Sequence, residues 1–99
     1  MNEIEELIQR RRRQVLVNSY LYYQMNMNLI DDHTYDKWSK ELSELQQKYP
    51  QESKNVKFYY EEFEDFDGST GYHLPKDEWL HDLCFRLLTE HKRRKEDGI

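Results

Sequence analysis

The sequence has a single cysteine and no long apolar run. Cys84, alone among the 99 residues, excludes an intramolecular disulfide and fits a reducing compartment. No stretch approaches the roughly 18 consecutive apolar residues that a membrane span requires. The N-terminus has acidic residues ahead of its arginines and no apolar run after them, unlike a signal peptide. These absences predict a soluble, cytoplasmic protein without a membrane segment.

Positive charge is also scarce. Fifteen Lys and Arg residues stand against 20 Asp and Glu residues, which gives a net charge of -5. This balance argues against direct DNA binding, which needs a basic surface. Charged residues make up 35% of the chain, but the 14% of aromatic residues supply large buriable surfaces that disordered chains lack. The composition therefore predicts one small folded domain.

Two helical patterns meet across a short loop in the first half of the chain. Apolar residues recur at near-helical spacing from Glu3 to Met25, and glutamates occupy the first turn, where carboxylates stabilise a helix. The asparagines within 26–31 suit a turn, Asp32 is placed to cap a second helix, and Pro50 marks its end. Residues 1–50 are therefore predicted to form an antiparallel helical hairpin.

The second half, residues 51–99, is predicted to add a short β element and a C-terminal helix to that hairpin. Residues 51–55 are polar and read as a connector, and the aromatic stretch 57–63 favours a strand. Turn formers at 65–71 predict a loop or a hairpin turn that leads into residues 72–74. A helical stripe follows, formed by Trp79, Leu80, Leu83, Cys84, Leu87 and Leu88. The expected fold class is mainly α, a small α+β domain.

Four consecutive arginines occur within the first predicted helix. Arg10–Arg13 spread over slightly more than one turn, so they cannot all face one partner. They form either a solvated face with local ion pairs, such as Glu6 with Arg10, or a phosphate contact. No aromatic residues interleave with them for stacking on bases, which favours the solvated face.

The junction of the two helices carries a distinctive pattern. Tyr22-Tyr23 is followed by Asp32-His33-Thr34-Tyr35-Asp36 and then by a helix written KWSKELSELQQKYP. This pattern resembles the N-terminal helical domain, called Ia, of bacterial NAD-dependent DNA ligases. The resemblance covers residues 10–50, and it extends to Ile30, Glu41-Leu42, Leu45 and Pro50 at the family spacing.

The resemblance implies a site for the nicotinamide mononucleotide (NMN) half of NAD. It implies that Tyr22 and Tyr35 flank the nicotinamide ring and that Asp32 and Asp36 hydrogen-bond its amide or ribose. Tyr23 stands where some family members have a histidine that helps with the phosphate. Aromatic faces suit a flat cationic ring, and carboxylates accept hydrogen bonds from hydroxyl and N–H groups. The candidate cofactor is NAD or NMN, with these five residues as its site.

Each candidate residue also has a structural interpretation. Asp32 suits a helix cap, and Tyr35 lies on the apolar stripe of the second helix and suits burial against the first. Asp36 has Lys40 four residues on, the spacing of a surface ion pair. His81 and Cys84 share a helix face, but two ligands do not make a zinc site, so no metal is expected.

Two functions follow as hypotheses. The leading one is a non-catalytic, stand-alone relative of the ligase domain, of a bacterial or bacteriophage type, that recognises a nicotinamide nucleotide in the bacterial or infected host cell. The chain lacks the nucleotidyltransferase lysine motif and the later ligase domains, so we expect no enzyme activity. The alternative is a protein-interaction module, monomeric or dimeric, that uses the hairpin as scaffold and acts on DNA-metabolism proteins. Its contact surface would be the aromatic group of Phe58, Tyr59, Tyr60, Phe63, Phe66, Tyr72 and Trp79.

Overall fold

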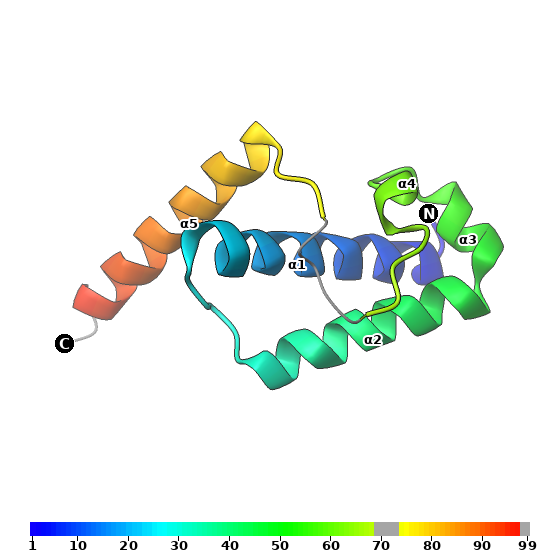
Figure 1. The fold of residues 1–99 in the computed structure, drawn as a ribbon, viewed down its shortest axis with the longest axis horizontal. Helices are drawn as coiled ribbons and strands as arrows, with labels where there is room; N and C mark the ends of the chain where they lie inside the picture. The colour runs from blue at the N-terminus through cyan, green and yellow to red at the C-terminus, as the bar shows by residue number, and fades with distance from the viewer. Residues whose placement is uncertain (69–73, 98–99) are drawn as a thin grey trace.

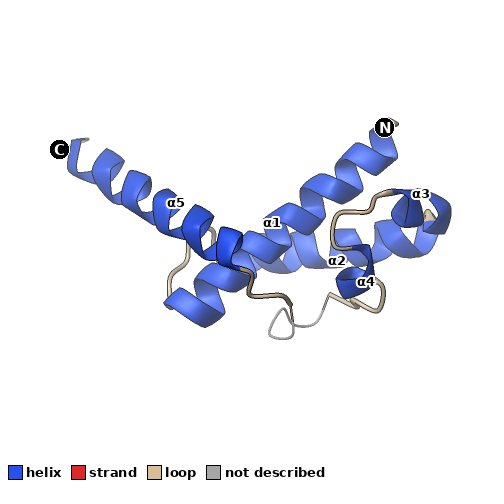
Figure 2. Ribbon diagram, turned by 90° about the horizontal axis from the view of Figure 1, so that it is seen from above, coloured by secondary structure: helices blue, strands red, loops and turns tan. Residues whose placement is uncertain are grey.

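The structure, a computed structural model, describes residues 1–68 and 74–97, and these form five α-helices (Figure 1). In chain order the helices are α1 (Glu3–Met25), α2 (Asp32–Lys48), α3 (Pro50–Asn55), α4 (Tyr60–Phe63) and α5 (Glu78–Asp97). The prediction of a mainly helical fold is confirmed. No strand occurs in the described part of the chain (Figure 2), so the predicted β element at 57–63 is wrong. Part of the loop or hairpin turn predicted at 65–71, and residues 72 and 73 after it, lie outside the described residues.

Helix α1 begins and ends with the local signals that its sequence contains. The Asn2 side chain accepts a hydrogen bond from the Glu5 amide, and the Glu5 side chain accepts one from the Asn2 amide, which forms a capping box. At the other end Asn26 adopts the left-handed conformation, with φ 52°, and its amide bonds to the carbonyl of Leu21. The chain then reverses, and α2 runs antiparallel to α1 as predicted (Figure 1).

The core is built around α1, which contacts α2, α3 and α5. Ile8, Val15, Leu16 and Leu21 of α1 are fully buried. They share the core with buried residues from the other elements, namely Leu42, Val56, Phe63, Leu74, Leu80 and Cys84. The C-terminal turns of α5 extend beyond the end of α1, away from this core (Figures 1 and 2).

A buried arginine joins the first helix to the segment that follows the hairpin. All five guanidinium N–H groups of Arg12 have acceptors. Nε donates to Gln46 Oε1 at 2.9 Å, and Nη1 donates to the carbonyls of Val56 and Phe58 at 2.7 and 2.9 Å. Nη2 donates to the carbonyl and the hydroxyl of Ser53 at 2.9 and 2.8 Å. Because these acceptors are neutral, hydrogen-bond geometry rather than a buried ion pair holds Arg12 in place.

The arginine run is therefore only partly the solvated face that its sequence favoured. Arg10 and Arg13 are exposed, whereas Arg12 is fully buried. Arg11 lies between these extremes, 3.4 Å from the Glu41 carboxylate and beside the Trp38 ring. Burial lowers the pKa of Arg12 to about 10, and the guanidinium stays charged at neutral pH. Of the four arginines only Arg12 is fully buried, because the side of α1 that carries it faces the segment 53–58.

Arg12 also explains why 57–63 is not a strand. The carbonyls of Val56 and Phe58, which would bond to a neighbouring strand, are taken by the guanidinium. Tyr59 then adopts a left-handed backbone conformation, with φ 51°, that breaks any extended run. The short helix α4 follows and buries Phe63 completely.

The predicted connector at 51–55 is helical as well. Helix α2 ends at Lys48, close to the predicted end at Pro50, but Pro50 starts α3 instead of closing the hairpin. Proline is favoured in the first turn of a helix because it lacks an N–H group that would stay unpaired there. Helix α3 places the carbonyl and the hydroxyl of Ser53 within hydrogen-bonding distance of Arg12. None of the helices described is long and apolar enough to cross a membrane.

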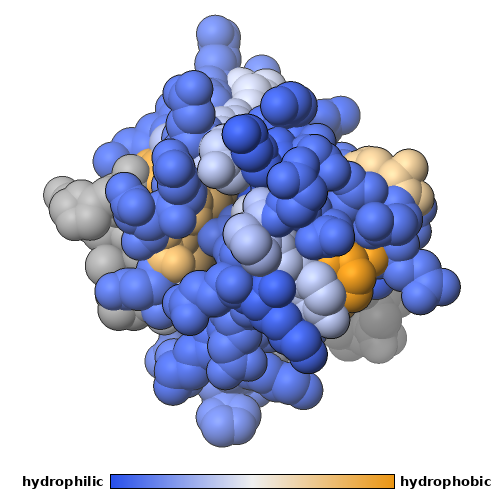
Figure 3. All heavy atoms as spheres, turned by 90° about the vertical axis from the view of Figure 1, so that its right-hand side faces the viewer, coloured by the Kyte–Doolittle hydropathy of each residue, from blue (hydrophilic) through white to orange (hydrophobic). Residues whose placement is uncertain are grey.

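Hydrophilic side chains cover most of the end of the molecule that carries α3 and α4 (Figure 3). Apolar residues reach the surface there only in small areas between them. Apart from Met1 at the N-terminus, the large exposed apolar side chains among the described residues lie elsewhere, at the end of α1, in the loop after it and on α5, and they are Tyr22, Tyr23, Met27, Trp79 and Phe85.

Replacing Arg12 with leucine should destabilise the fold strongly. The substitution removes the donors for the carbonyls of Ser53, Val56 and Phe58, and each buried acceptor without a donor costs about 1–3 kcal/mol. We expect the free energy of unfolding to fall by about 3 kcal/mol or more in urea titrations followed by tryptophan fluorescence. The exposed neighbour Arg13→Leu is the control and should stay within about 0.5 kcal/mol of the wild type. Equal effects of the two changes would contradict the role of Arg12.

Candidate functional site

A cleft of about 380 Å³ lies at the loop end of the helical hairpin, where α1 ends and α2 begins. The last turns of α1, the loop, the first turn and a half of α2 and one distant loop residue contribute to its walls. Its lining consists of Asn18, Tyr22, Tyr23, Asn28, Ile30, Asp32, Tyr35, Asp36 and Gly68. The five residues proposed from the sequence, Tyr22, Tyr23, Asp32, Tyr35 and Asp36, are thus brought together around a single cleft.

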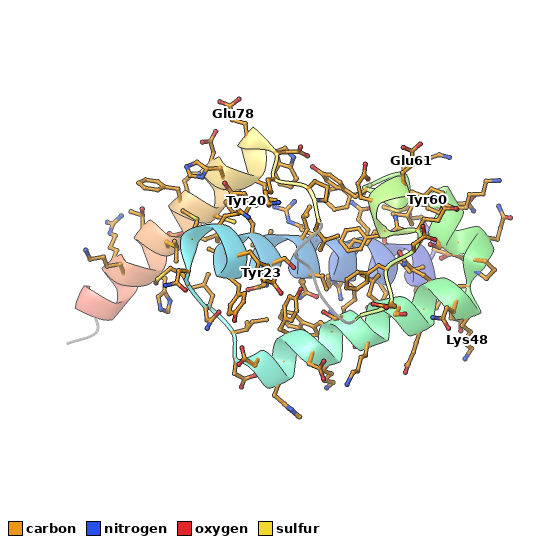
Figure 4. The ribbon with its side chains drawn as sticks, viewed as in Figure 1. Tyr20, Tyr23, Lys48, Tyr60, Glu61 and Glu78 are labelled. Carbon is orange, nitrogen blue, oxygen red and sulfur yellow. The ribbon has the colours of Figure 1, made fainter. Side chains whose placement is uncertain are left out.

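Two tyrosines at the end of α1 form one wall. Tyr22 and Tyr23 meet edge to face, with ring centroids 4.8 Å apart, an arrangement that aromatic pairs favour. Their exposed fractions are 50% and 38%. Figure 4 shows Tyr23 on the side of α1 that faces α2, whereas Tyr20 lies toward α5. The Tyr20 hydroxyl is 2.8 Å from His81 Nδ1 on α5, so Tyr20 belongs to the fold rather than to the cleft.

The third tyrosine is held from the opposite helix. Tyr35 on α2 is half-buried, and its hydroxyl lies 2.6 Å from the Ser19 hydroxyl on α1. Burial raises the pKa of Tyr35, and the hydrogen bond with Ser19 partly opposes this rise because it stabilises the phenolate. The predicted contact of Tyr35 with the first helix is confirmed. This contact fixes the side chain at the base of the cleft.

The capping role that the sequence suggested for Asp32 belongs to its neighbour. Asp31 is the N-cap of α2, and its carboxylate accepts from the Thr34 amide at 2.6 Å. This hydrogen bond lowers the pKa of Asp31. The prediction was one residue late because Asp31 and Asp32 are both cap-forming residues ahead of the same helix. With the cap supplied by Asp31, the exposed Asp32 carboxylate is left to line the cleft.

Asp36 lines the cleft and also forms an ion pair on the surface. Its carboxylate lies 2.9 Å from Lys40 Nζ, the predicted partner four residues on. Both side chains are more than half exposed, and such pairs contribute little to stability. The ion pair therefore leaves Asp36 able to exchange its partner for a ligand.

Several lining residues escaped the sequence analysis. Asn18 lies four residues before Tyr22, so helical spacing alone pointed to it. Gly68 is distant in sequence, and no local pattern connects it with the hairpin. It has φ 84°, and an added Cβ would lie 3.1 Å from the carbonyl oxygen of Ser39. Glycine at 68 thus lets its loop close against the backbone of α2.

His81 and Cys84, which share a helix face, have separate structural roles. Cys84 is fully buried and its thiol contacts the carbonyl of Val17 at 3.7 Å, so it is a core residue. His81 bonds to Tyr20. Among the described residues no group of three His, Cys, Asp or Glu side chains is placed to hold a metal ion.

Removing the Ser19 hydroxyl should raise the pKa of Tyr35 further. In Ser19→Ala the phenolate loses the hydrogen bond that opposes the effect of burial. Ultraviolet absorbance titration, with Tyr35→Phe to assign the transition, measures this pKa. The matched variant Ser43→Ala removes another buried hydroxyl from the same bundle and should leave the Tyr35 transition in place. An unchanged or lower pKa in Ser19→Ala would contradict the assigned contact.

Comparison with known proteins identifies the family to which the helices around the cleft belong. The family described as DNA ligase-like, N-terminal NAD+-binding domain matches residues 1–55, which span α1, α2 and α3. The searches of curated proteins and of solved structures each gave no significant match. The match covers more than half of the 99 residues and includes every helix that lines the cleft. The chain belongs to the family of DNA ligase-like N-terminal NAD+-binding domains.

Proposed function

We propose that the cleft binds the nicotinamide nucleoside part of NAD or NMN, and that the domain recognises this ligand without catalysing a reaction on it. One observation carries the proposal. The three tyrosines and two aspartates implied by the ligase resemblance come from both helices of the hairpin, and all five line the same cleft. The family match supports the same class of ligand.

The size and chemistry of the cleft fit this ligand. Small-molecule sites have volumes of roughly 300–1,000 Å³, and the cleft, at about 380 Å³, suits a nucleoside rather than a whole dinucleotide. Tyr22, Tyr23 and Tyr35 offer aromatic faces to a flat cationic ring. Asp32 and Asp36 offer carboxylate oxygens to ribose hydroxyls and carboxamide N–H groups.

The cleft offers the phosphate group of NMN no cationic side chain among its described lining residues. The residues that line the cleft include two carboxylates and, among those described, no Lys, Arg or His, and Lys40, which pairs with Asp36, lies outside this lining. Two carboxylates attract the nicotinamide cation and repel a phosphate. We therefore infer that the nicotinamide ring and ribose supply the binding energy and that the phosphate points toward solvent.

Ligand size limits the affinity. A ligand of about two dozen heavy atoms, at roughly 0.3 kcal/mol per atom, gains about 7 kcal/mol, which corresponds to a dissociation constant of about 10 μM. The tyrosines of the outer wall are half exposed, so the ligand keeps much of its surface in water. Binding between about 10 μM and 1 mM is therefore expected.

Removing one carboxylate from the cleft should abolish saturable binding. We expect NMN, titrated into isotope-labelled protein, to shift the backbone amide resonances of Tyr22, Asp32, Tyr35 and Asp36. Asp36→Asn should lose these shifts, because it removes the negative charge next to the ligand and costs the fold only an exposed ion pair. Glu44→Gln, the same chemical change at an exposed site of α2 outside the cleft, should bind like the wild type.

Three ligands separate the parts of the proposal. Nicotinamide riboside, which lacks the phosphate, should bind about as well as NMN, whereas the reduced, uncharged riboside should bind more weakly. A flat titration with both NMN and the riboside at millimolar concentration would sink the proposal. The shared ancestry with the ligase domain would then be one of fold alone.

The alternative function, a protein-interaction module, depends on the aromatic residues between 58 and 79 being exposed, and most of them are not. Phe63 is fully buried, and Phe58, Tyr59 and Phe66 pack against the core. Trp79 is partly exposed, but its indole N–H donates to the Tyr59 hydroxyl, which in turn donates to Asp77. Tyr72 lies outside the described residues. Most of these rings therefore stabilise the fold. A more exposed aromatic side chain, Phe85, lies on α5.

A further inference from the structure

An apolar groove lies between the last turn of α1 and helix α5, outside the nucleotide cleft. It has a volume of about 440 Å³, and its walls include Met25 from α1 and His81, Phe85, Leu88 and Lys92 from α5. Phe85 is 61% exposed although it is one of the largest apolar side chains of the helix. Phe85 and the apolar groove beside it form a continuous apolar area, which is the kind of surface that a partner can cover.

Helix α5 therefore has one face buried against α1 and a second face that lines the groove, on which Phe85 and Leu88 are the apolar residues and Leu88 also packs against the core. One face is buried against α1 and contains Leu80 and Cys84. The other contains His81, Phe85, Leu88 and Lys92, at spacings of four, three and four residues, which is the repeat of a seam between two paired helices. The C-terminal turns of α5 extend past the end of α1 (Figures 1 and 2), so a second helix can lie along α5 there.

The charges along α5 identify the kind of helix that fits. The start of the helix is acidic, with Asp77 just before it and Glu78 and Asp82 within it. Its later turns contain four basic residues, 92 to 95, and three acidic ones, Glu90, Glu96 and Asp97, so they are slightly positive on balance. A parallel copy would bring the acidic first turns together, whereas an antiparallel copy brings them toward the basic residues 92 to 95 of the other copy. The helix is thus electrostatically complementary to itself in the antiparallel direction.

We propose that a second copy of this chain covers the groove, through antiparallel pairing of the two α5 helices about a two-fold axis near residues 86 and 87. In this register Phe85 of each copy lies opposite Leu88 of the other. Asp82 lies within about one residue rise, ~1.5 Å along the axis, of the level of Lys92 in the other copy. The interface is isologous, as is usual for two-fold dimers.

The expected dimer is weak. Each copy carries a net charge of -5, so the two copies repel one another outside the interface. Stable interfaces bury more than about 1,000 Å² in total, and few exposed apolar side chains line this groove. The dimer should therefore form in proportion to protein concentration and dissociate on dilution.

Exchanging charges tests the pairing without reference to nucleotide binding. In sedimentation velocity up to about 1 mM protein, the wild type should shift toward dimer as concentration rises. Asp82→Lys alone and Lys92→Glu alone should each stay monomeric, because each places like charges opposite one another twice. An equimolar mixture of the two variants should dimerise again, since the mixed pair restores both opposite-charge contacts.

Two results would overturn the proposal. The first is a wild type that stays monomeric throughout this range, which would leave the groove to another protein. The second is a mixture of the charge variants that dimerises no better than either alone. Phe85→Ser gives an independent check, because this exposed side chain can be removed without unfolding the core. It should keep the helical circular dichroism of the wild type and lose the dimer.

Discussion

The buried guanidinium of Arg12 is the interaction on which the rest of the architecture depends. A single side chain of α1 reaches Gln46 on α2, Ser53 on α3 and the carbonyls of Val56 and Phe58. Because an arginine has five donors in a rigid plane, all these elements must adopt positions that serve one planar group. The segment after the hairpin folds back on α1 for this reason, and Phe63 is thereby carried into the core.

The same packing leaves two surfaces at the opposite end of α1. Its last turns direct Tyr22 and Tyr23 into the cleft shared with α2, and Met25 into the groove shared with α5. The αL residue Asn26 ends the helix immediately after these side chains. The proposed nucleotide site and the proposed dimer contact therefore depend on one helix terminus, and each has a different neighbour.

Local signals identified much of the fold and of the cleft. The capping box of α1, the asparagine at its end and the apolar stripe of α2 act through neighbours in sequence, so they predicted the hairpin. The ligase pattern identified five of the lining residues for the same reason, since they lie within 15 residues of one another, from Tyr22 to Asp36. The strand predicted at 57–63 was wrong because the carbonyl of Phe58, and that of Val56 just before the segment, bond to an arginine more than 40 residues earlier.

The sequence by itself determined the family, the helical hairpin and the tyrosines and aspartates of the candidate site, because each depends on spacing along one or two helices. Only the tertiary structure decided which of four adjacent arginines is buried, since burial depends on the facing segment 53–58. It also placed Gly68 against α2, where a larger residue would meet the backbone of Ser39. These contacts join residues far apart in the chain, so no pattern among neighbouring residues in the sequence predicts them.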